Sequence, residues 1–231
     1  MTGEASGTAY EIGAPRPEWM ARVAAFDARG HEWFERFSPP PGTTKRSAVL
    51  MLFAPSVDGR AGESVVLTER AHTLRSHPGQ VSFPGGSIDA TDDGPVGAAL
   101  RETEEEVGIP PATVDVVTAI PELYLTPSSN AVTPVLGWWP TPAEVRAVDP
   151  AEVARAELVP VAELTDPDNR FVVTHPLGYR GPGFRAGGLY IWGFTAMLLS
   201  VLLEESGLAR PWDEGREELL SKDHMSPWMR D

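Results

Sequence analysis

The sequence predicts an α+β fold, arranged as an α/β/α sandwich around a mixed β-sheet. Two observations favour this class. Segments with strand-like and helix-like patterns follow one another without strict alternation, and 231 residues with 42% hydrophobic content are ample for one large core. The chain contains no cysteine, which excludes a disulfide framework, a thiolate metal site and a cysteine nucleophile.

The first third of the chain is predicted to hold one helix and two strands. Apolar residues at helical spacing indicate a helix over residues 17–37, and the proline-rich stretch 38–44 interrupts it. Residues 46–54 and 63–70 are rich in β-branched and other apolar residues, and a turn-rich stretch joins them. These two segments are therefore expected to be strands of the central sheet.

The second half of the chain is predicted to alternate irregularly between strands and helices. The expected elements are strands over residues 113–125, 131–140 and 151–160, a short helix over 161–164, strands over 171–175 and 187–193, and a final helix over 192–206. These patterns divide the chain into an N-terminal extension with one helix (1–40), a main domain (41–206) and a polar C-terminal tail (207–231).

Net charge bears on the class of partner. The formal charge of −14 argues against general nucleic-acid binding, which needs a basic face. A phosphate-bearing small molecule stays possible if side chains or a metal supply local positive charge. The longest apolar run, Ala196 to Leu203, is too short to span a membrane, and the N-terminus lacks the pattern of a signal peptide. We therefore expect a cytoplasmic protein.

A cluster of glutamates marks the helix that follows Gly94. Asp92 or Asp93 can cap the start of this helix, Pro95 suits its first turn, and Gly108 ends it. At 3.6 residues per turn, one face of the helix is mostly apolar. That face comprises Val96, Ala99, Leu100, Thr103 and Val107.

Three carboxylates, Glu102, Glu105 and Glu106, share a different face at spacings of three and four residues. Like charges at this spacing destabilise a helix by a few tenths of a kcal/mol per pair, roughly, and a hard divalent cation such as Mg²⁺ reverses that effect. A solvated acidic face is the alternative interpretation. The preceding loop, with Gly85 and Gly86 placed for close approach to a ligand, favours a metal site.

These residues resemble the Nudix hydrolase box. Its second half matches "RETEEEVGI", which begins at Arg101, with Thr103 in place of a bulky apolar residue. The first half departs further, because Gly86 and Asp92 are correctly spaced from each other but leave eight residues before Arg101 instead of seven. The usual spacing leads to Asp93 and Ser87 instead, so the upstream acid is left open between the two aspartates.

A second motif, "LTERAHTLRSHPGQVSFPGG", lies directly upstream and resembles the element that precedes the box in the coenzyme A pyrophosphatase subfamily. Arg70 and Arg75 are local cations in this segment, and Arg suits phosphate because it offers two donors at once. The alternative for each is a structural salt bridge to the glutamates. His77 is interpreted as a solvated loop residue. The matching positions are Leu67, Thr68, Arg70, Ala71, Arg75, Gly79, Phe83, Pro84, Gly85 and Gly86.

The resemblance implies a Nudix fold and metal-dependent hydrolysis of the diphosphate bond of coenzyme A or acyl-CoA. The products would be (acyl-)4′-phosphopantetheine and adenosine 3′,5′-bisphosphate. Glu102, Glu105 and Glu106 would bind Mg²⁺ or Mn²⁺, and Arg101 would orient a neighbouring glutamate. Arg70, Arg75, Gly85 and Gly86 would contact substrate.

Several points stay open at this level. The proton from the attacking water could go to any of the three helix glutamates or to a loop acid, because clustered carboxylates titrate as a group. Glu152 is either such a distal acid or an exposed residue at the start of a strand. The substrate could instead be another nucleoside diphosphate derivative, such as ADP-ribose or NADH. A non-catalytic nucleotide sensor and a homodimer are also left open.

Overall fold

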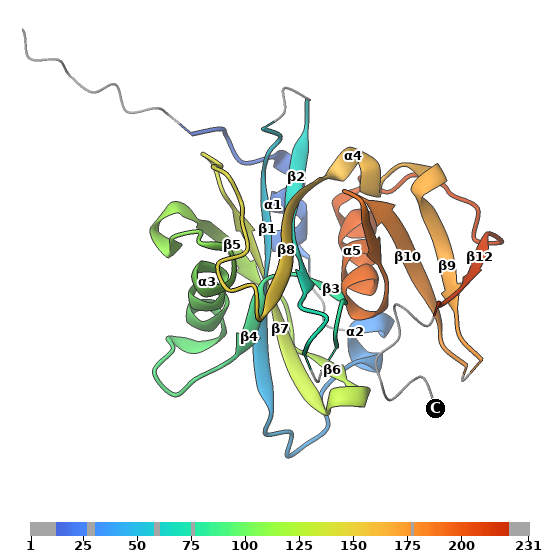
Figure 1. Ribbon diagram of the computed structural model, residues 1–231, viewed down its shortest axis with the longest axis horizontal. Coiled ribbons are helices and arrows are strands. Elements are labelled where there is room, and N and C mark those ends of the chain that lie inside the picture. The colour runs from blue at the N-terminus through green and yellow to red at the C-terminus, as the bar shows by residue number, and fades with distance from the viewer. Residues whose placement is uncertain (1–12, 27–30, 58–60, 75–76, 177, 222–231) are drawn as a thin grey trace, which may run out of the picture.

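The computed structural model describes residues 13–26, 31–57, 61–74, 77–176 and 178–221. Arg75, one of the two arginines proposed to bind substrate, lies outside these residues. Figure 1 shows a central mixed sheet with helix α3 (Gly94–Val107) on one face and α1 (Glu18–Ala25) and α5 (Gly193–Ser206) on the other. The predicted sandwich around a mixed sheet is therefore confirmed, with a second, smaller sheet added outside α5.

The central sheet has eight strands. Strands β1 and β7 pair in parallel from Arg46 to Phe53 on β1, whereas the other pairings are antiparallel, which makes the sheet mixed. The strands are β1 (Arg46–Pro55), β2 (Glu63–Arg70), β3 (Val81–Ser82), β4 (Gly85–Ser87), β5 (Asp115–Ala119), β6 (Leu123–Leu125), β7 (Asn130–Trp138) and β8 (Val153–Pro160).

Two hydrophobic clusters cover the two faces of this sheet. Side chains alternate between faces along a strand, so Met51 and Phe53 of β1 join the cluster beneath α5, while Leu50 and Leu52 join the cluster beneath α3. The N-terminal extension contributes to the first cluster through Met20 and other residues of α1 and through α2 (Glu32–Arg36). The sheet is thus buried on both faces.

Helix α5 is apolar on all sides, which is the pattern of a helix enclosed by protein. Its second cover is a four-stranded sheet that lies on the right in Figure 1. That sheet comprises β9 (Arg170–Thr174), β10 (Arg180–Ala186), β11 (Leu189–Ile191) and β12 (Glu217–Leu219), with α4 (Val161–Leu164) leading into it from β8.

Arg170 joins the small sheet to α5 and to the C-terminal segment. The residue is 2% exposed, and its guanidinium lies between the rings of Phe184 and Trp212, at 4.8 and 4.5 Å from their centroids. Its Nη2 donates a hydrogen bond of 2.6 Å to Ser200 Oγ of α5. Trp212 precedes β12, which pairs in parallel with β9, so the segment after α5 is part of the fold.

Several sequence expectations need correction. The single helix over residues 17–37 is wrong, because α1 ends at Ala25 and α2 begins only at Glu32. The single strand over residues 113–125 is also wrong: a short 3₁₀ turn (Pro111–Thr113) precedes β5, and residues 120–122 separate β5 from β6. Strands β3, β4, β10 and β12 were not expected. Asp93 occupies the cap position of α3 but makes no capping hydrogen bond with its side chain.

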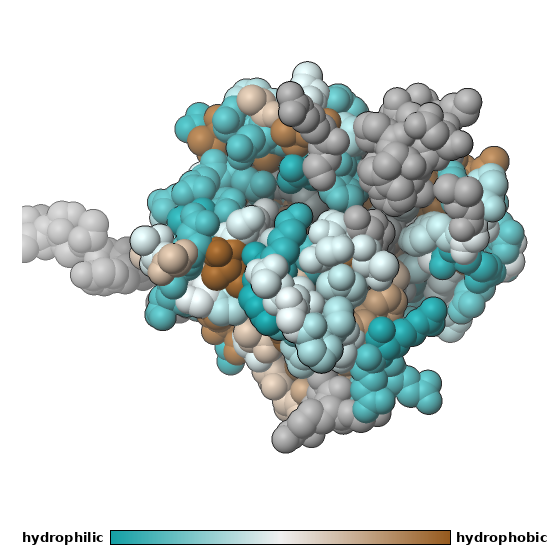
Figure 2. All heavy atoms as spheres, turned by 90° about the horizontal axis from the view of Figure 1, so that it is seen from below, coloured by the Kyte–Doolittle hydropathy of each residue, from teal (hydrophilic) through white to brown (hydrophobic). Residues whose placement is uncertain are grey.

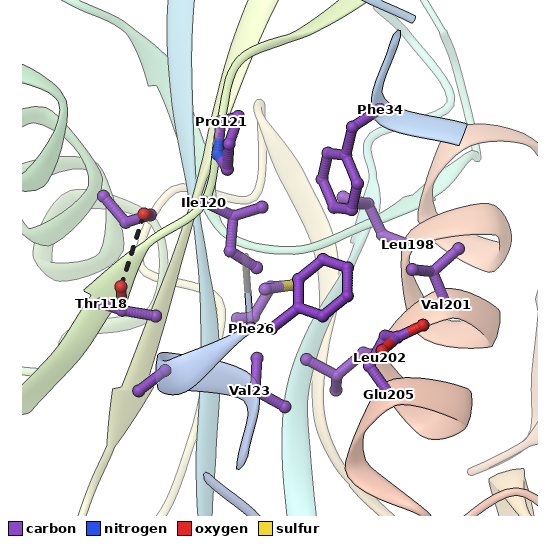
Figure 3. A pocket seen from close by; sticks show the side chains of 13 residues that line it. Val23, Phe26, Phe34, Thr118, Ile120, Pro121, Leu198, Val201, Leu202 and Glu205 are labelled. Atoms are coloured by element: carbon purple, nitrogen blue, oxygen red, sulfur yellow. Dashed lines mark hydrogen bonds between the residues drawn. The ribbon is translucent and has the colours of Figure 1, made fainter. Parts of the chain in front are cut away.

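An apolar pocket lies between α1, α2, β5 and α5 (Figure 3). Phe26, Phe34, Ile120 and Leu202 face one another across it, on the side of the sheet away from α3. The outer surface has a different character, since Figure 2 shows a mostly hydrophilic face with small separate apolar patches. Within the described part of the chain, no helix has the length and hydropathy needed to cross a membrane.

Candidate functional site

The site is built where strands β1 and β2 separate. They pair with each other only from Phe53 to Pro55 on β1 and from Glu63 to Val65 on β2. Beyond that point, β3 pairs with the end of β2 and β4 pairs with the start of β1. The segment over residues 81–87 therefore crosses between the two strands, fixed midway by a 2.8 Å hydrogen bond from Leu50 N to Pro84 O.

The two glycines of β4 are required by close contacts. A side chain at Gly85 would overlap the backbone of β1 at Ala48 and Val49, and one at Gly86 would overlap the carboxyl group of Glu102. At Gly85, only glycine lets β4 lie against β1, whereas a side chain at Gly86 would displace the Glu102 carboxyl group from its position. The group that approaches Gly86 here is the protein's own Glu102 carboxylate, and contact of the two glycines with substrate stays a prediction.

Glu106 is the most enclosed of the predicted glutamates. It is 7% exposed, and its Oε2 accepts a 3.1 Å hydrogen bond from Gly85 N. Burial raises the pKa of Glu106 to about 7, against the opposing effects of this hydrogen bond and of the charge on Arg70. The charges of Glu102 and Glu152 raise that pKa further. A buried carboxyl beside two others is an electrostatically costly arrangement that positive charge would relieve.

Arg101 connects the start of α3 to the glutamate face. Its Nε and Nη2 donate to the two carboxylate oxygens of Asp92 at 2.9 and 3.0 Å, a bidentate pair. Its Nη1 donates to Glu102 at 3.0 Å and to Glu105 at 3.1 Å. The predicted pairing of Arg101 with a neighbouring glutamate is confirmed, and it extends to three carboxylates.

This arrangement distinguishes the two aspartates that the sequence left open. The guanidinium of Arg101 lowers the pKa of Asp92 by hydrogen bonding, so Asp92 stays ionised and holds the loop against the helix. Asp93 is exposed and has no such contact among the described residues. Asp92, at the correct spacing from Gly86, is thus the aspartate that pairs with Arg101, and the extra residue before Arg101 lies at the start of the helix.

Thr103 stands where the family pattern has a bulky apolar residue. It is 1% exposed, and its Oγ1 donates a 2.7 Å hydrogen bond to Ala99 O one turn earlier. The buried hydroxyl is therefore satisfied within the helix. With Ala99 and Val107, Thr103 forms the buried part of the predicted apolar face, so the substitution leaves the packing of α3 intact.

The three helix glutamates differ in environment. Glu102 is partly buried, and burial raises its pKa despite the hydrogen bond from Arg101. The side chain of Glu105 is 59% exposed, and its described partner is Arg101. Among the described residues, no three His, Asp or Glu side chains converge as a preformed metal cage. In this structure Arg101 bridges Glu102 and Glu105, whereas Glu106 is bound by Gly85 N.

Glu152 was underestimated by the sequence analysis. It precedes β8, and its carbonyl oxygen accepts a 2.8 Å hydrogen bond from Ala71 N just after β2. Its charge raises the pKa values of both Glu102 and Glu106, so it reaches the site from another loop. It is also exposed and lies just before β8, as one of the two interpretations expected, and its function as a distal acid stays a prediction.

The chemistry of this group fits a hard divalent cation. Glu102, Glu106 and Glu152 offer only oxygen donors, and they already act on one another electrostatically. Mg²⁺ and Mn²⁺ prefer such donors and need few protein ligands when substrate phosphates complete the coordination. A shared cation would convert the mutual repulsion of the carboxylates into attraction, and Glu105 could join by leaving Arg101.

Comparison with known proteins identifies the family. The model of the NUDIX domain matches residues 44–176. A protein described as "Uncharacterized Nudix hydrolase NudL" from Cronobacter sakazakii is 39% identical over 170 residues, covering 71% of this chain and 83% of that protein. A protein of the same description from Escherichia coli is 37% identical over 156 residues, covering 64% and 78%.

A solved structure shows the same fold. The crystal structure of RenU, a Nudix hydrolase from M. smegmatis, matches with a TM-score of 0.50 at 20% identity, covering 73% of this chain and 89% of that one. The match to the NUDIX model spans more than half of this chain and includes the loop, α3 and Glu152. This protein is therefore a member of the NUDIX family, with the fold of a Nudix hydrolase and the carboxylate-bearing helix of a Nudix diphosphatase.

Proposed function

We propose that this Nudix diphosphatase hydrolyses the diphosphate bond of coenzyme A or acyl-CoA. The observation that carries the diphosphatase chemistry is the buried Glu106, held by Gly85 N and surrounded by Glu102 and Glu152. The choice of coenzyme A rests on the upstream motif, of which Arg70 is the described cation. The products would be (acyl-)4′-phosphopantetheine and adenosine 3′,5′-bisphosphate.

The side chains have separate tasks in this proposal. Glu102, Glu106 and Glu152, with Glu105 after it leaves Arg101, would hold Mg²⁺ or Mn²⁺. When bound, the metal supplies charge neutralisation, polarises a phosphoryl oxygen and makes a water molecule easier to deprotonate. Arg101 keeps Glu102 oriented through its anchor on Asp92, as partners of metal-binding carboxylates commonly do.

The proton transfer is assigned to the carboxylate group as a whole. A water oxygen forms a bond to one phosphorus, the bond from that phosphorus to the bridging oxygen breaks, and the second phosphate leaves. The proton passes to a carboxylate of this group that is not saturated by metal. The charges of Glu102 and Glu152 act on Glu106, so no single carboxylate is named as the base.

The test is identification of the products after incubation with coenzyme A and Mg²⁺ or Mn²⁺. The expected result is 4′-phosphopantetheine and adenosine 3′,5′-bisphosphate in equal amounts. ADP-ribose and NADH are tested as substrates under the same conditions. Cleavage of those compounds without cleavage of coenzyme A would overturn the substrate assignment and leave the diphosphatase chemistry. Absence of turnover on the whole panel would favour a non-catalytic nucleotide sensor.

A second experiment addresses Arg75, which lies outside the described residues. Coenzyme A carries a 3′-phosphate that dephospho-coenzyme A lacks, and a chain at −14 needs a specific cation to accept it. Arg75→Ala is expected to lower kcat/KM for coenzyme A by about tenfold to a hundredfold relative to dephospho-coenzyme A. Equal losses on both substrates would mean that Arg75 serves the diphosphate or the glutamates instead.

A further inference from the structure

The segment over residues 81–87 contacts both helices that cover the central sheet. It lies where β1 and β2 separate, so it fills a gap within the sheet. On the side of α3, Gly85 N donates its hydrogen bond to Glu106. On the side of α5, Phe83 is buried in the hydrophobic cluster that α5 covers. One short segment therefore links the carboxylate-bearing helix to the apolar helix on the opposite face.

A buried hydroxyl group of α5 holds the start of this segment. Thr195 is 5% exposed, and its Oγ1 donates a 2.9 Å hydrogen bond to Val81 O of β3. A threonine within a helix commonly donates to a carbonyl of its own preceding turn. Thr195 lies in the first turn of α5 and donates instead to a residue 114 positions earlier in the chain. This hydrogen bond therefore connects α5 with β3.

The acceptor of this bond needs a partner outside the sheet. Strand β3 is an edge strand of the central sheet. Gln80 O accepts a hydrogen bond from Arg70 N of β2, so the next carbonyl along the chain, that of Val81, points away from β2. Val81 is buried, and a buried carbonyl without a hydrogen bond is costly. Thr195 supplies the donor that a further strand would otherwise provide.

The rest of the segment is fixed residue by residue. Thr68 Oγ1 lies 3.2 Å from Ser82 O and 3.1 Å from Ser82 Oγ. Pro84 O accepts a 2.8 Å hydrogen bond from Leu50 N, and Gly85 lies directly against the backbone of β1. Closely packed segments transmit a displacement instead of absorbing it. A shift at the β3 end of the segment should therefore move Gly85 N.

We propose that Thr195 is a positioning residue for the glutamates of α3: through β3, its hydroxyl group fixes the Gly85 N–H that orients Glu106. The inference rests on the proposed diphosphatase function, in which Glu106 binds the metal, and adds a residue from the opposite face of the sheet. Hydrogen-bond partners of metal-binding carboxylates set the geometry and affinity of the site. Gly85 N is such a partner, and Thr195 acts one step behind it. Thr195 thus differs from the buried leucines of α5, which contribute packing alone.

The test compares Thr195→Val, which removes the hydroxyl group at nearly constant volume, with Thr195→Ser, which keeps it. Ser206→Ala is the matched control on the same helix, because the buried Oγ of Ser206 donates at 3.0 Å to Leu203 O within α5. Mn²⁺ affinity, measured by electron paramagnetic resonance, is expected to fall about tenfold in Thr195→Val and to stay near the wild-type value in the other two variants. Unchanged affinity in Thr195→Val, or an equal loss in either of the other variants, would overturn the proposal.

A second measurement follows the link in the metal-free protein. Nuclear magnetic resonance of the isotope-labelled full chain reports hydrogen exchange at the Gly85 amide. Relative to the amides of β7, this exchange should become faster in Thr195→Val and stay unchanged in Ser206→Ala, whereas general destabilisation would raise exchange at both places alike. If the valine variant does not fold, Thr195→Cys replaces it, since cysteine has a similar size and is only a weak donor.

Both measurements work without substrate, so they separate this inference from the proposed function. If the protein cleaves no diphosphate substrate, yet Mn²⁺ affinity and the Gly85 amide depend on the hydroxyl group of Thr195, the proposed function fails and the link stands. If the protein cleaves coenzyme A while Thr195→Val behaves like Ser206→Ala, only this inference fails.

Discussion

Helices α3 and α5 have the same length, 14 residues, and lie on opposite faces of one sheet, yet they differ in how far the protein buries them. Helix α3 is covered on one side only, and its open side presents Arg101, Glu102 and Glu105. Helix α5 is covered on both sides by sheets, and its buried residues are almost all apolar. Both helices end at a left-handed glycine, Gly108 and Gly207.

The difference shows how the domain separates chemistry from stability. A helix with one face open to solvent can carry charged side chains that stay partly hydrated. Glu106 is the one carboxylate of α3 that is buried in the protein. A helix with two covered faces contributes to stability by burial, at roughly 25 cal/mol per Å² of apolar surface. Changes on α3 should therefore affect turnover, and changes to the apolar side chains of α5 should affect the free energy of unfolding.

The largest expected effect is on α3. Glu106→Gln keeps the shape and the hydrogen bond to Gly85 N possible but removes the negative charge, so we expect turnover to fall by about a thousandfold, or about 4 kcal/mol in activation free energy. Steady-state kinetics with Mg²⁺ or Mn²⁺ measures it. Glu104→Gln is the matched control on the same helix, since Glu104 is exposed and lies off the glutamate face. Equal losses of turnover in the two variants would contradict the role assigned to the glutamate face of α3.

The next effect is on α5. Leu199 is fully buried between the two sheets, and Leu199→Ala should lower the free energy of unfolding by about 2–5 kcal/mol through lost burial and the cavity left behind. Chemical denaturation measures it. At a temperature where the variant stays folded, kcat should change less than about twofold. Glu204→Ala, exposed in the last turn, is the control and should leave stability within about 0.5 kcal/mol.

A third prediction sharpens the role of the enclosed carboxylate through pH. The pKa of Glu106 is raised to about 7 in the folded metal-free protein, above the ordinary value near 4.5, so the folded state favours the protonated form. The protonated Glu106 therefore stabilises the folded state fully at pH values below its ordinary pKa. This stabilisation is lost as pH rises through about 7. Thermal melting of the metal-free protein should therefore show a Tm that falls between pH 5 and 7, roughly, and less so in Glu106→Gln.

Metal reverses that trend. Metal binds the ionised carboxylate, so affinity for Mg²⁺ or Mn²⁺ should increase with pH up to about 7 and then level off. Added metal should raise Tm, because it binds only the folded state, and the increase should be greatest near neutral pH. A rise in Tm with metal that is the same at every pH would contradict the assignment of Glu106 as a ligand.

The smallest expected effect concerns the two glycines that end the helices. Gly108 has a φ of 73° and Gly207 a φ of 76°, so alanine at either position should cost about 1 kcal/mol in the free energy of unfolding. Differential scanning calorimetry of Gly108→Ala and Gly207→Ala measures both. A Cβ at Gly207 would also displace the end of Arg22, a flexible group that can move. A much larger loss at Gly108 would show that α3 contributes to stability as well as to chemistry.

Local patterns predicted the part of the site that lies on one helix. The shared face of Glu102 and Glu106 and the glycine stop at Gly108 follow from helical periodicity and from backbone preference, which depend on neighbouring residues only. The pairing of Arg101 with glutamates could be foreseen for the same reason. The family resemblance then supplied the fold, because the box and the upstream motif occur together.

The remaining parts depend on contacts between distant segments. Glu152 comes near the site because β8 pairs with β2, and that pairing leaves no mark in the local sequence. Asp92 is distinguished from Asp93 only by the reach of Arg101 back across the loop. Strand β10, "RGPGFRA", contains Gly and Pro where a strand pattern has apolar residues, so no alternation reveals it.

The position of β12 affects how the newly made chain becomes a folded protein. Strand β9 leaves the ribosome well before β12, the strand that covers its outer edge in parallel pairing. During that interval β9 presents unpaired backbone groups, and Trp212 has not yet closed over Arg170. An open strand edge can pair with another chain, so slow translation between these two strands would lengthen an interval that favours aggregation.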